Sequence, residues 1–220
     1  VSRGVREDCW ILTSYWNVMN GSDFVSVGVE QIDDVGEDVV VDVWRNWNLV
    51  SFSGVEQVCL SDIVVSYDGS DYSWDEAVSG GLVLDFVYGW NRTENSYEGV
   101  DVLESGFGYW LWAFENCSLG VVGNGSVGDV VTDLEVQWNL IGLPFNETIA
   151  KEDLVIAYNY TDYSWFEATT SNNEEGEPLI LGYIYGWNSQ QYLLSDYLVT
   201  GNAYWFYSYY NCTLKGNSSN

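Results

Sequence analysis

The sequence contains no histidine and few basic residues. Six Lys and Arg residues stand against 33 acidic ones, so the net charge is −27. Without histidine, the chain cannot use Ser-His or histidine acid–base catalysis, and it cannot bind zinc through imidazole. A negative charge of this size repels phosphate backbones, so no nucleic-acid partner is expected. Divalent cations and basic surfaces are the partners that the charge favours.

Proline and long apolar runs are also scarce. With only Pro144 and Pro178 in the chain, glycine, Asn and Asp must form most turns. No apolar run is long enough to span a membrane, so no integral membrane segment is expected. The sequence also lacks a Walker loop, a dinucleotide fingerprint and a long 3.6-residue apolar period. We therefore expect little helix and no cofactor.

Aromatic residues, by contrast, are abundant. The chain contains 12 Trp, 17 Tyr and 8 Phe, which together make up 17% of its residues. Disordered acidic chains lack aromatics, so this chain is expected to fold. Tyr, Trp and Phe favour half-buried strands, and so does the valine that accompanies them. The composition therefore predicts an all-β protein.

The four cysteines are widely spaced and form no CxxC pair, which argues against a thiolate metal site. An even number of separate cysteines is typical of disulfides formed in an oxidising compartment. We predict two disulfides and leave all three connectivities open, although buried reduced cysteines would give the same pattern. The cysteines are Cys9, Cys59, Cys117 and Cys212.

Asn-X-Ser/Thr sequons occur eight times, against roughly two or three expected by chance. The excess predicts N-linked glycans and, with the cysteines, an extracellular or cell-surface location. The alternative is that Asn, Ser and Thr simply gather in β-turns. Because the chain starts at Val1, we expect that a signal peptide has been removed, although a shortened chain would start in the same way. The candidate glycosylation sites are Asn20, Asn91, Asn116, Asn124, Asn146, Asn159, Asn211 and Asn217.

The chain contains an internal repeat of about 90 residues. Trp47-Asn48-Leu49 returns as Trp138-Asn139-Leu140, and several other segments return in the same order. Because the matching segments return in the same order, coincidence is not a credible explanation for the repeat. We divide the chain into an N-terminal extension (1–37), repeat 1 (38–128) and repeat 2 (129–220). The other matches pair Asp71-Tyr72-Ser73-Trp74 with Asp162-Tyr163-Ser164-Trp165, Tyr88-Gly89-Trp90-Asn91 with Tyr185-Gly186-Trp187-Asn188, Tyr109-Trp110 with Tyr204-Trp205, and Asn116-Cys117 with Asn211-Cys212.

Each repeat is predicted to be a small β-sandwich or barrel-like domain built from short strands, with a single helical turn at 57–62 and at 148–153. Two further strands are expected in the extension, whereas repeat 2 ends soon after Leu214. A surplus of strands at the N-terminal end and a deficit of strands at the C-terminal end would suit head-to-tail strand donation between copies. The alternative is that the extension completes a sheet of its own chain. The candidate donor residues are Cys9, Trp10, Ile11, Leu12, Tyr15 and Trp16.

The repeat motifs resemble those of a known family. Residues 138–144, 185–188 and 204–205 are similar to the tandem WNLI-x-LP … GYW β-repeat of archaeal and some bacterial extracellular cell-surface proteins. The resemblance implies a small extracellular β-domain with a structural or adhesive role and no catalytic residues. Together with the sequons, it favours an archaeal source. The sequence departs from the motif at Ala203, where the family has the glycine that Gly108 keeps.

Two acidic patterns could carry chemistry. Asp71 with Glu76, repeated as Asp162 with Glu167, could form the carboxylate pair of a glycosidase. The alternative, which we favour, is that Asp71 and Asp162 cap turns. A loop of repeat 1 offers oxygen ligands for calcium, although its spacing is not that of an EF-hand and repeat 2 does not keep all three ligands. The candidate calcium ligands are Asp68, Asp71 and Asp75.

Near the end of each repeat, residues 107–114 and 203–210 alternate in a way that predicts a strand with an aromatic row. One row could stack on sugars or contact another subunit. The alternative is a central strand that is packed on both faces. The two faces carry Tyr109, Leu111 and Ala113 against Trp110, Trp112 and Phe114 in repeat 1, and Tyr204, Phe206 and Ser208 against Trp205, Tyr207 and Tyr209 in repeat 2.

These observations predict an extracellular structural glycoprotein rather than an enzyme. We expect a self-assembling subunit of a surface fibre, filament or surface layer, with head-to-tail β-strand donation as one route to assembly. Its partners would be copies of itself and glycans, and its non-protein components N-linked glycans and calcium. The alternative is a carbohydrate-binding or adhesion module that uses the aromatic rows.

Overall fold

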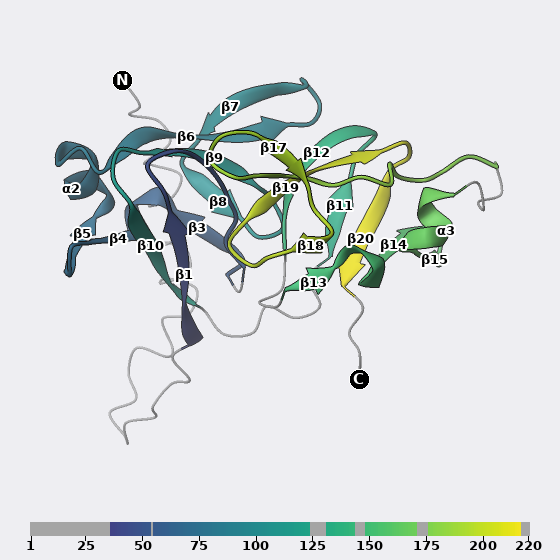
Figure 1. Ribbon diagram of the computed structural model, residues 1–220, viewed down its shortest axis with the longest axis horizontal. Helices are drawn as coiled ribbons and strands as arrows, with labels where there is room; N and C mark the ends of the chain where they lie inside the picture. The colour runs from purple at the N-terminus through teal and green to yellow at the C-terminus, as the bar shows by residue number, and fades with distance from the viewer. Residues whose placement is uncertain (1–35, 54, 124–130, 144–147, 171–175, 217–220) are drawn as a thin grey trace, which may run out of the picture. The chain divides into compact units, whose positions relative to one another are not determined.

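The computed structural model describes residues 36–53, 55–123, 131–143, 148–170 and 176–216, which belong to one compact unit (Figure 1). This part of the chain is mostly antiparallel strand, so the predicted all-β fold is confirmed. None of its helices has the length and apolar character needed to cross a membrane. Outside the described residues lie all six candidate donor residues (Cys9, Trp10, Ile11, Leu12, Tyr15 and Trp16) and the sequons at Asn20, Asn124, Asn146 and Asn217.

Repeat 1 contains three antiparallel sheets, with strand orders β1-β10-β4-β5, β2-β9-β6-β7 and β3-β8. A 3-10 turn (Leu60–Asp62) and the short helix α2 (Trp74–Ser79) connect them. The strands are β1 (Gly36–Val43), β2 (Asn46–Val50), β3 (Gln57–Cys59), β4 (Val64–Tyr67), β5 (Ser70–Ser73), β6 (Val83–Asn91), β7 (Ser96–Val100), β8 (Val102–Glu104), β9 (Tyr109–Ala113) and β10 (Cys117–Gly123).

Repeat 2 contains the same three sheets, with strand orders β11-β20-β14-β15, β12-β19-β16-β17 and β13-β18. A second 3-10 turn (Lys151–Asp153) and helix α3 (Trp165–Thr169) match those of repeat 1. The strands are β11 (Thr132–Leu134), β12 (Gln137–Gly142), β13 (Ile149–Ala150), β14 (Leu154–Tyr158), β15 (Thr161–Ser164), β16 (Tyr185–Trp187), β17 (Tyr192–Leu194), β18 (Tyr197–Leu198), β19 (Ala203–Ser208) and β20 (Cys212–Gly216).

Corresponding strands have corresponding neighbours in the two repeats. β10 lies between β1 and β4, and β20 lies in the same way between β11 and β14. β9 lies between β2 and β6, as β19 lies between β12 and β16. The prediction that repeat 2 lacks a strand is therefore wrong. In the described residues, its sheets contain the same set of strands as those of repeat 1.

Each repeat has its own apolar core. Leu111 on β9 and Leu119 on β10 are fully buried in the core of repeat 1. Their counterparts Phe206 on β19 and Leu214 on β20 are buried in the core of repeat 2. Because side chains alternate along a strand, the residues next to Leu111 on β9 and next to Phe206 on β19 point to the opposite face of the sheet. A third, smaller cluster of buried side chains combines residues of both repeats.

The motif shared by residues 71–77 and 162–168 starts a short helix in each repeat. The Ser73 hydroxyl accepts the N–H of Glu76 over 3.4 Å, while the Glu76 carboxylate accepts the N–H of Ser73 over 2.9 Å. Ser164 and Glu167 form the same capping box at α3. Such a box satisfies two backbone donors at the helix start, so it fixes the turn from strand to helix.

The prediction of two disulfides among the four cysteines is wrong. Cys117 and Cys212 are free thiols, and each is buried in the core of its own repeat. Burial raises the pKa of the Cys117 thiol to about 11 and also raises the pKa of Cys212. Cys59 is disulfide-bonded, but Cys9 lies outside the described residues, and no disulfide joins two described cysteines.

Candidate functional site: two aromatic clefts between the repeats

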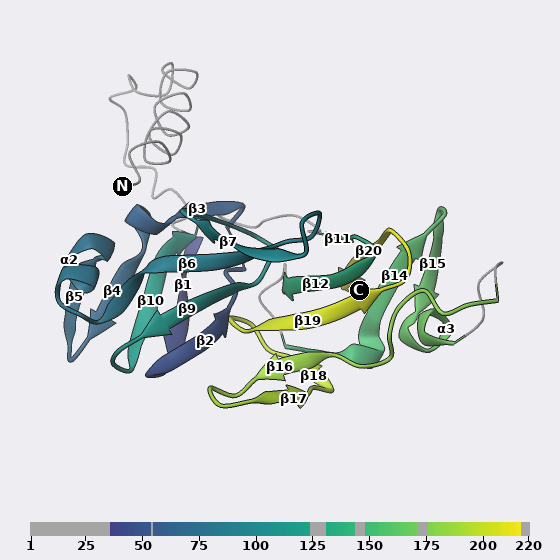
Figure 2. The ribbon, with the colours of Figure 1, turned by 90° about the horizontal axis from the view of Figure 1, so that it is seen from above.

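The two repeats meet through matching backbone hydrogen bonds. The Ser51 N–H donates to the Gly201 carbonyl over 3.0 Å, and the Gly142 N–H donates to the Gly106 carbonyl over 3.1 Å. Ser51 corresponds to Gly142 in the repeat, and Gly106 corresponds to Gly201. Each repeat therefore offers the same surface to the other, as in a two-fold symmetric dimer. Strands β16 and β19 of repeat 2 contact β2 of repeat 1 at this junction (Figure 2).

Small residues allow the close approach. A Cβ atom on Gly108 would lie 2.4 Å from the Cβ of Ala203, and one on Gly142 would lie 2.2 Å from the Cβ of Ser51. Each of these pairs joins counterparts from the two repeats, so both pairs lie near the pseudo-two-fold axis. Only one member of a pair can carry a side-chain carbon. The Ala203 methyl group is tolerated because Gly108, its counterpart in repeat 1, leaves the space.

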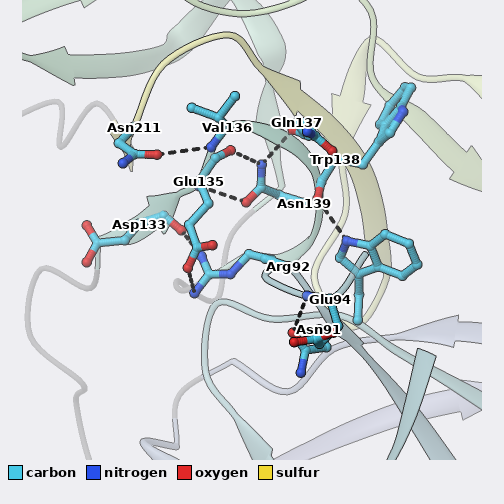
Figure 3. A network of polar contacts seen from close by, with 11 residues as sticks. Asn91, Arg92, Glu94, Asp133, Glu135, Val136, Gln137, Trp138, Asn139 and Asn211 are labelled. Atoms are coloured by element: carbon cyan, nitrogen blue, oxygen red, sulfur yellow. Dashed lines mark hydrogen bonds and ion pairs between the residues drawn. The ribbon is translucent and has the colours of Figure 1, made fainter. Parts of the chain in front are cut away.

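The Trp-Asn-Leu motif positions one tryptophan of each repeat at the junction. The buried Asn139 side chain accepts the N–H of Glu135 over 3.0 Å and donates to the Glu135 carbonyl over 2.8 Å, which closes the turn before β12 (Figure 3). Asn48 closes the turn before β2 in the same way. Trp138 and Trp47, one residue earlier, therefore point to the opposite face of each sheet from these asparagines.

Two indole–carbonyl hydrogen bonds cross the junction. The Trp90 Nε1–H donates to the Trp138 carbonyl over 2.9 Å, and the Trp187 Nε1–H donates to the Trp47 carbonyl over 2.9 Å. Trp90 and Trp187 are counterparts in the Tyr-Gly-Trp-Asn motif, so the two bonds repeat the pseudo-symmetry. Each indole is thereby fixed against the other repeat, with its ring left at the surface of the junction.

Aromatic side chains from both repeats enclose two open clefts, with volumes of about 450 and about 420 Å³. Every residue of the first cleft has its repeat counterpart in the second. Tyr97 on β7 and Tyr192 on β17 line both, so the two clefts are adjacent. The first is lined by Trp90, Tyr97, Trp138, Tyr185, Tyr192 and Trp205, and the second by Trp187, Tyr192, Trp47, Tyr88, Tyr97 and Trp110.

The cleft walls stand nearly perpendicular to one another. The Trp90 and Trp205 rings lie 5.0 Å apart at 83°, and their counterparts Trp187 and Trp110 lie 5.1 Å apart at 80°. Trp138 meets Trp205 at 87°. Edge-to-face contacts of this kind are favourable for aromatic pairs, so the rings hold one another in place. The result is a pair of rigid corners rather than a flat platform.

The clefts have few polar atoms. The Trp205 Nε1–H donates to the Tyr192 hydroxyl over 3.3 Å. Burial raises the pKa of Tyr97, so its hydroxyl stays neutral at physiological pH. No charged side chain is among the cleft residues. The clefts therefore suit a ligand group that makes contact with ring faces.

In each repeat, one of the two predicted rows lies in the core and the other lies on the opposite face of the sheet. Tyr109, Leu111 and Ala113 lie in the core of repeat 1. On the other face, Trp110 lines a cleft, Trp112 is half-buried and Phe114 is exposed. Repeat 2 follows the same pattern, and there Tyr207 extends the edge-to-face contacts outward from Trp138, with ring centroids 5.1 Å apart. The clefts thus contain only one residue of each predicted row, Trp110 or Trp205.

Sequence reasoning missed the remaining cleft residues. The Tyr-Gly-Trp-Asn motif, which contributes Trp90 and Trp187, indicates only the repeat when the sequence is considered alone. Tyr97 and Tyr192 follow that motif at slightly different distances in the two copies. The signal that could have pointed to these residues is that this Trp-containing motif occurs twice in a chain rich in tryptophan. Nothing in the linear sequence indicates that the repeats pack on each other.

One arginine braces the junction on one side only (Figure 3). The Arg92 guanidinium donates to the Asp133 carbonyl over 2.5 Å and lies 3.4 Å from a Glu135 carboxylate oxygen. It also lies 4.9 Å from the centroid of the Phe107 ring. Ser189 occupies the corresponding position in repeat 2, so this contact breaks the symmetry between the repeats.

The acidic candidates do not form a site in the described residues. Glu76 and Glu167 cap helices, and hydrogen bonds from Ser73 and Ser164 lower their pKa values, whereas a general acid needs a raised pKa. Asp71 accepts a hydrogen bond from Ser66 over 2.6 Å. Within the described residues, the structure gathers no group of three acids or cysteines that could hold a metal ion, so the candidate ligands Asp68, Asp71 and Asp75 are not brought together.

Four of the eight sequons fall in the described residues. Asn116 and Asn211 are exposed counterparts, and each Oδ1 accepts a backbone N–H, from Arg45 over 2.8 Å and from Val136 over 3.0 Å. These bonds do not use Nδ2, the atom that would carry a glycan. Asn91 uses Nδ2 to donate to Glu98 over 3.1 Å, and Asn159 is exposed in a turn with a positive φ of 48°.

Comparisons of this chain with protein-family models, curated proteins and solved structures found no match.

Proposed function

We propose that the protein is a non-enzymatic adhesion module of an extracellular surface glycoprotein, which binds glycans at its two aromatic clefts. One observation carries the proposal: the same aromatic cleft occurs twice across the junction of the repeats. Glycans carry apolar faces and apolar substituents that pack on indole and phenol rings. Two clefts on one rigid unit would bind a polymeric ligand more tightly than either cleft alone, because the second contact is intramolecular.

The sequons and the surface charge support the extracellular part of the proposal. Asn116 and Asn211 are exposed and leave Nδ2 for a glycan, and the same positions carry sequons in both repeats. The net charge of −27 keeps the module soluble around its apolar clefts. No catalytic role is assigned to Glu76 or Glu167, because both already serve as helix caps.

Adhesion can be tested with beads that carry the protein, flowed over a panel of immobilised polysaccharides. We expect retention on at least one surface and its loss in the double variant Trp47→Ala, Trp138→Ala. The variant keeps the backbone carbonyls that accept the Trp187 and Trp90 N–H groups. Trp44→Ala is the matched control, because Trp44 is 56% exposed and lines neither cleft. Beads that adhere to no polysaccharide would reject the proposal.

A second candidate is the predicted fibre or surface-layer subunit, favoured by an exposed apolar edge on repeat 2. Strand β17 is the outer strand of its sheet, and its Leu193 and Leu194 are 45% and 60% exposed. Glu98 and Gly99 occupy the matching positions of β7 in repeat 1. Natural sheets protect open edges with charge, so an apolar edge favours pairing with another chain. Copies of this chain are the partner that we propose for the edge.

Assembly can be tested by negative-stain electron microscopy of the purified protein, with and without a calcium chelator. Regular fibres or sheets would support the subunit proposal, and their loss on chelation would identify calcium as a component. The variant Leu193→Glu gives repeat 2 the residue of repeat 1 and should disperse the polymer. Deleting residues 1–16 should abolish polymers if those residues donate a strand. Monomers under every condition would reject this candidate.

A further inference from the structure

The cleft walls offer little hydrogen bonding to a ligand. Three of the six indole N–H groups that line the clefts, those of Trp90, Trp187 and Trp205, already have partners in the protein. A ligand group that needs hydrogen bonds would lose those it makes with water and gain few in return. The group that enters a cleft should therefore be one without strong donors or acceptors of its own.

The shape of the clefts favours a compact group over a flat ring. Trp205 stands nearly perpendicular to both Trp90 and Trp138, and its counterpart Trp110 stands nearly perpendicular to both Trp187 and Trp47. A flat ring can stack on only one wall of such a corner. A rounded group, such as an ammonium surrounded by methyl groups, can contact several walls at once.

The electrostatics of the clefts and of the whole protein favour a positively charged ligand group. Indole faces carry negative electrostatic potential and attract cations, most strongly where water is excluded. The protein as a whole carries a charge of −27, and no Lys or Arg is among the cleft residues to oppose a cation. Neither of the two described arginines, Arg45 and Arg92, lines a cleft, and Arg92 is paired with Glu135. A cationic ligand is therefore attracted both locally and from a distance.

We infer that each cleft binds a quaternary ammonium group, such as the trimethylammonium head of a choline substituent. Such a group is cationic, rounded and free of N–H donors, so it meets the three conditions that the clefts set. A primary ammonium meets only the charge condition, because its three N–H donors would lack acceptors. The inference rests on the proposed function, since it names the group on the glycan or other surface polymer that the module recognises.

The test compares choline with 3,3-dimethyl-1-butanol, its neutral carbon isostere, by calorimetric titration of the unaltered protein. The two probes have nearly the same shape and differ in charge. We expect two choline sites per chain and binding of the isostere that is weaker by at least about tenfold. Methylammonium should also bind more weakly than tetramethylammonium. An isostere that binds as tightly as choline would overturn the inference.

Variants then assign the sites. Trp138→Ala and Trp47→Ala should each remove one of the two choline sites, and the double variant should remove both. Trp44→Ala should keep both. Choline binding that survives in a folded double variant would overturn the assignment to the clefts. If the double variant fails to fold, the comparison of choline with its isostere decides alone.

The result can be separated from that of the bead experiment. Adhesion to an unsubstituted polysaccharide without choline binding would leave the proposed function standing and reject the quaternary ammonium. Choline binding without adhesion to any polysaccharide would support the inference for the clefts and reject the glycan-adhesion function. Free choline that releases beads from a choline-substituted polymer would support both.

Discussion

A Cβ atom placed on Gly108 would lie 2.4 Å from the Cβ of its repeat counterpart, Ala203. It would also lie 2.9 Å from the Cγ of Leu140. We expect Gly108→Ala to destabilise the protein by about 1–3 kcal/mol, because the two repeats would have to move apart. The measurement is the free energy of unfolding from denaturant titration.

Gly99→Ala provides the matched control, because nothing lies within 4 Å of a Cβ at that position. It should change stability little. Ala203→Gly combined with Gly108→Ala should recover much of the loss, since the pair would again contain a single methyl group. Full stability of Gly108→Ala alone would show that the repeats are not packed as closely as described.

The crossed indole–carbonyl bonds predict equal costs at two distant sequence positions. Trp90→Phe and Trp187→Phe each remove one N–H donor from the junction. Each should lower the free energy of unfolding by about 1 kcal/mol, because a carbonyl loses its partner. Trp44→Phe serves as control, since the Trp44 side chain is exposed. A large cost at one position and none at the other would contradict the pseudo-symmetry.

The repeat, the all-β class and the division of β9 into two opposite rows were predictable from the sequence. Alternation placed Leu111 opposite Trp110 without any tertiary information, because side chains alternate along every strand. The 3-10 turns at Leu60–Asp62 and Lys151–Asp153 were also expected, as single helical turns within residues 57–62 and 148–153. These features depend on the order of neighbouring residues along the chain, which can be read directly from the sequence.

The clefts were not predictable because they depend on contacts between the repeats. Trp90 and Trp138 belong to different repeats, and their bond joins residues 48 positions apart. The disulfide prediction failed for a related reason: spacing does not tell that Cys117 and Cys212 belong to separate cores. The prediction that Asp71 and Asp162 cap turns is wrong, because both lie on strands, where Asp71 accepts a hydrogen bond from Ser66 and Asp162 accepts one from Lys215. The helix caps are Ser73 with Glu76 and Ser164 with Glu167, and the helices that they start were not predicted.

The capping boxes predict a specific dependence of stability on pH. Hydrogen bonds from Ser73 lower the pKa of Glu76 below its ordinary value of 4.5. Because the folded-state pKa is lowered, the carboxylate stabilises the fold above the ordinary pKa, and this contribution is lost as the pH falls through the lowered value. Glu76→Gln should therefore have a lower melting temperature than the unaltered protein at pH 7, and the gap should close in acid. A gap that widened in acid would contradict the cap.

The two free thiols should be unreactive in the folded protein. Cys117 and Cys212 are each 7% exposed, and burial raises the pKa of both, so little thiolate exists at pH 8. Iodoacetamide should label neither in the native protein and both after denaturation in guanidinium without a reductant, as counted by mass spectrometry. A Cys117–Cys212 disulfide would instead keep both unlabelled until a reductant is added. Fast labelling of the native protein would show that one core opens readily, and Cys117→Ala compared with Cys212→Ala would identify which repeat opens.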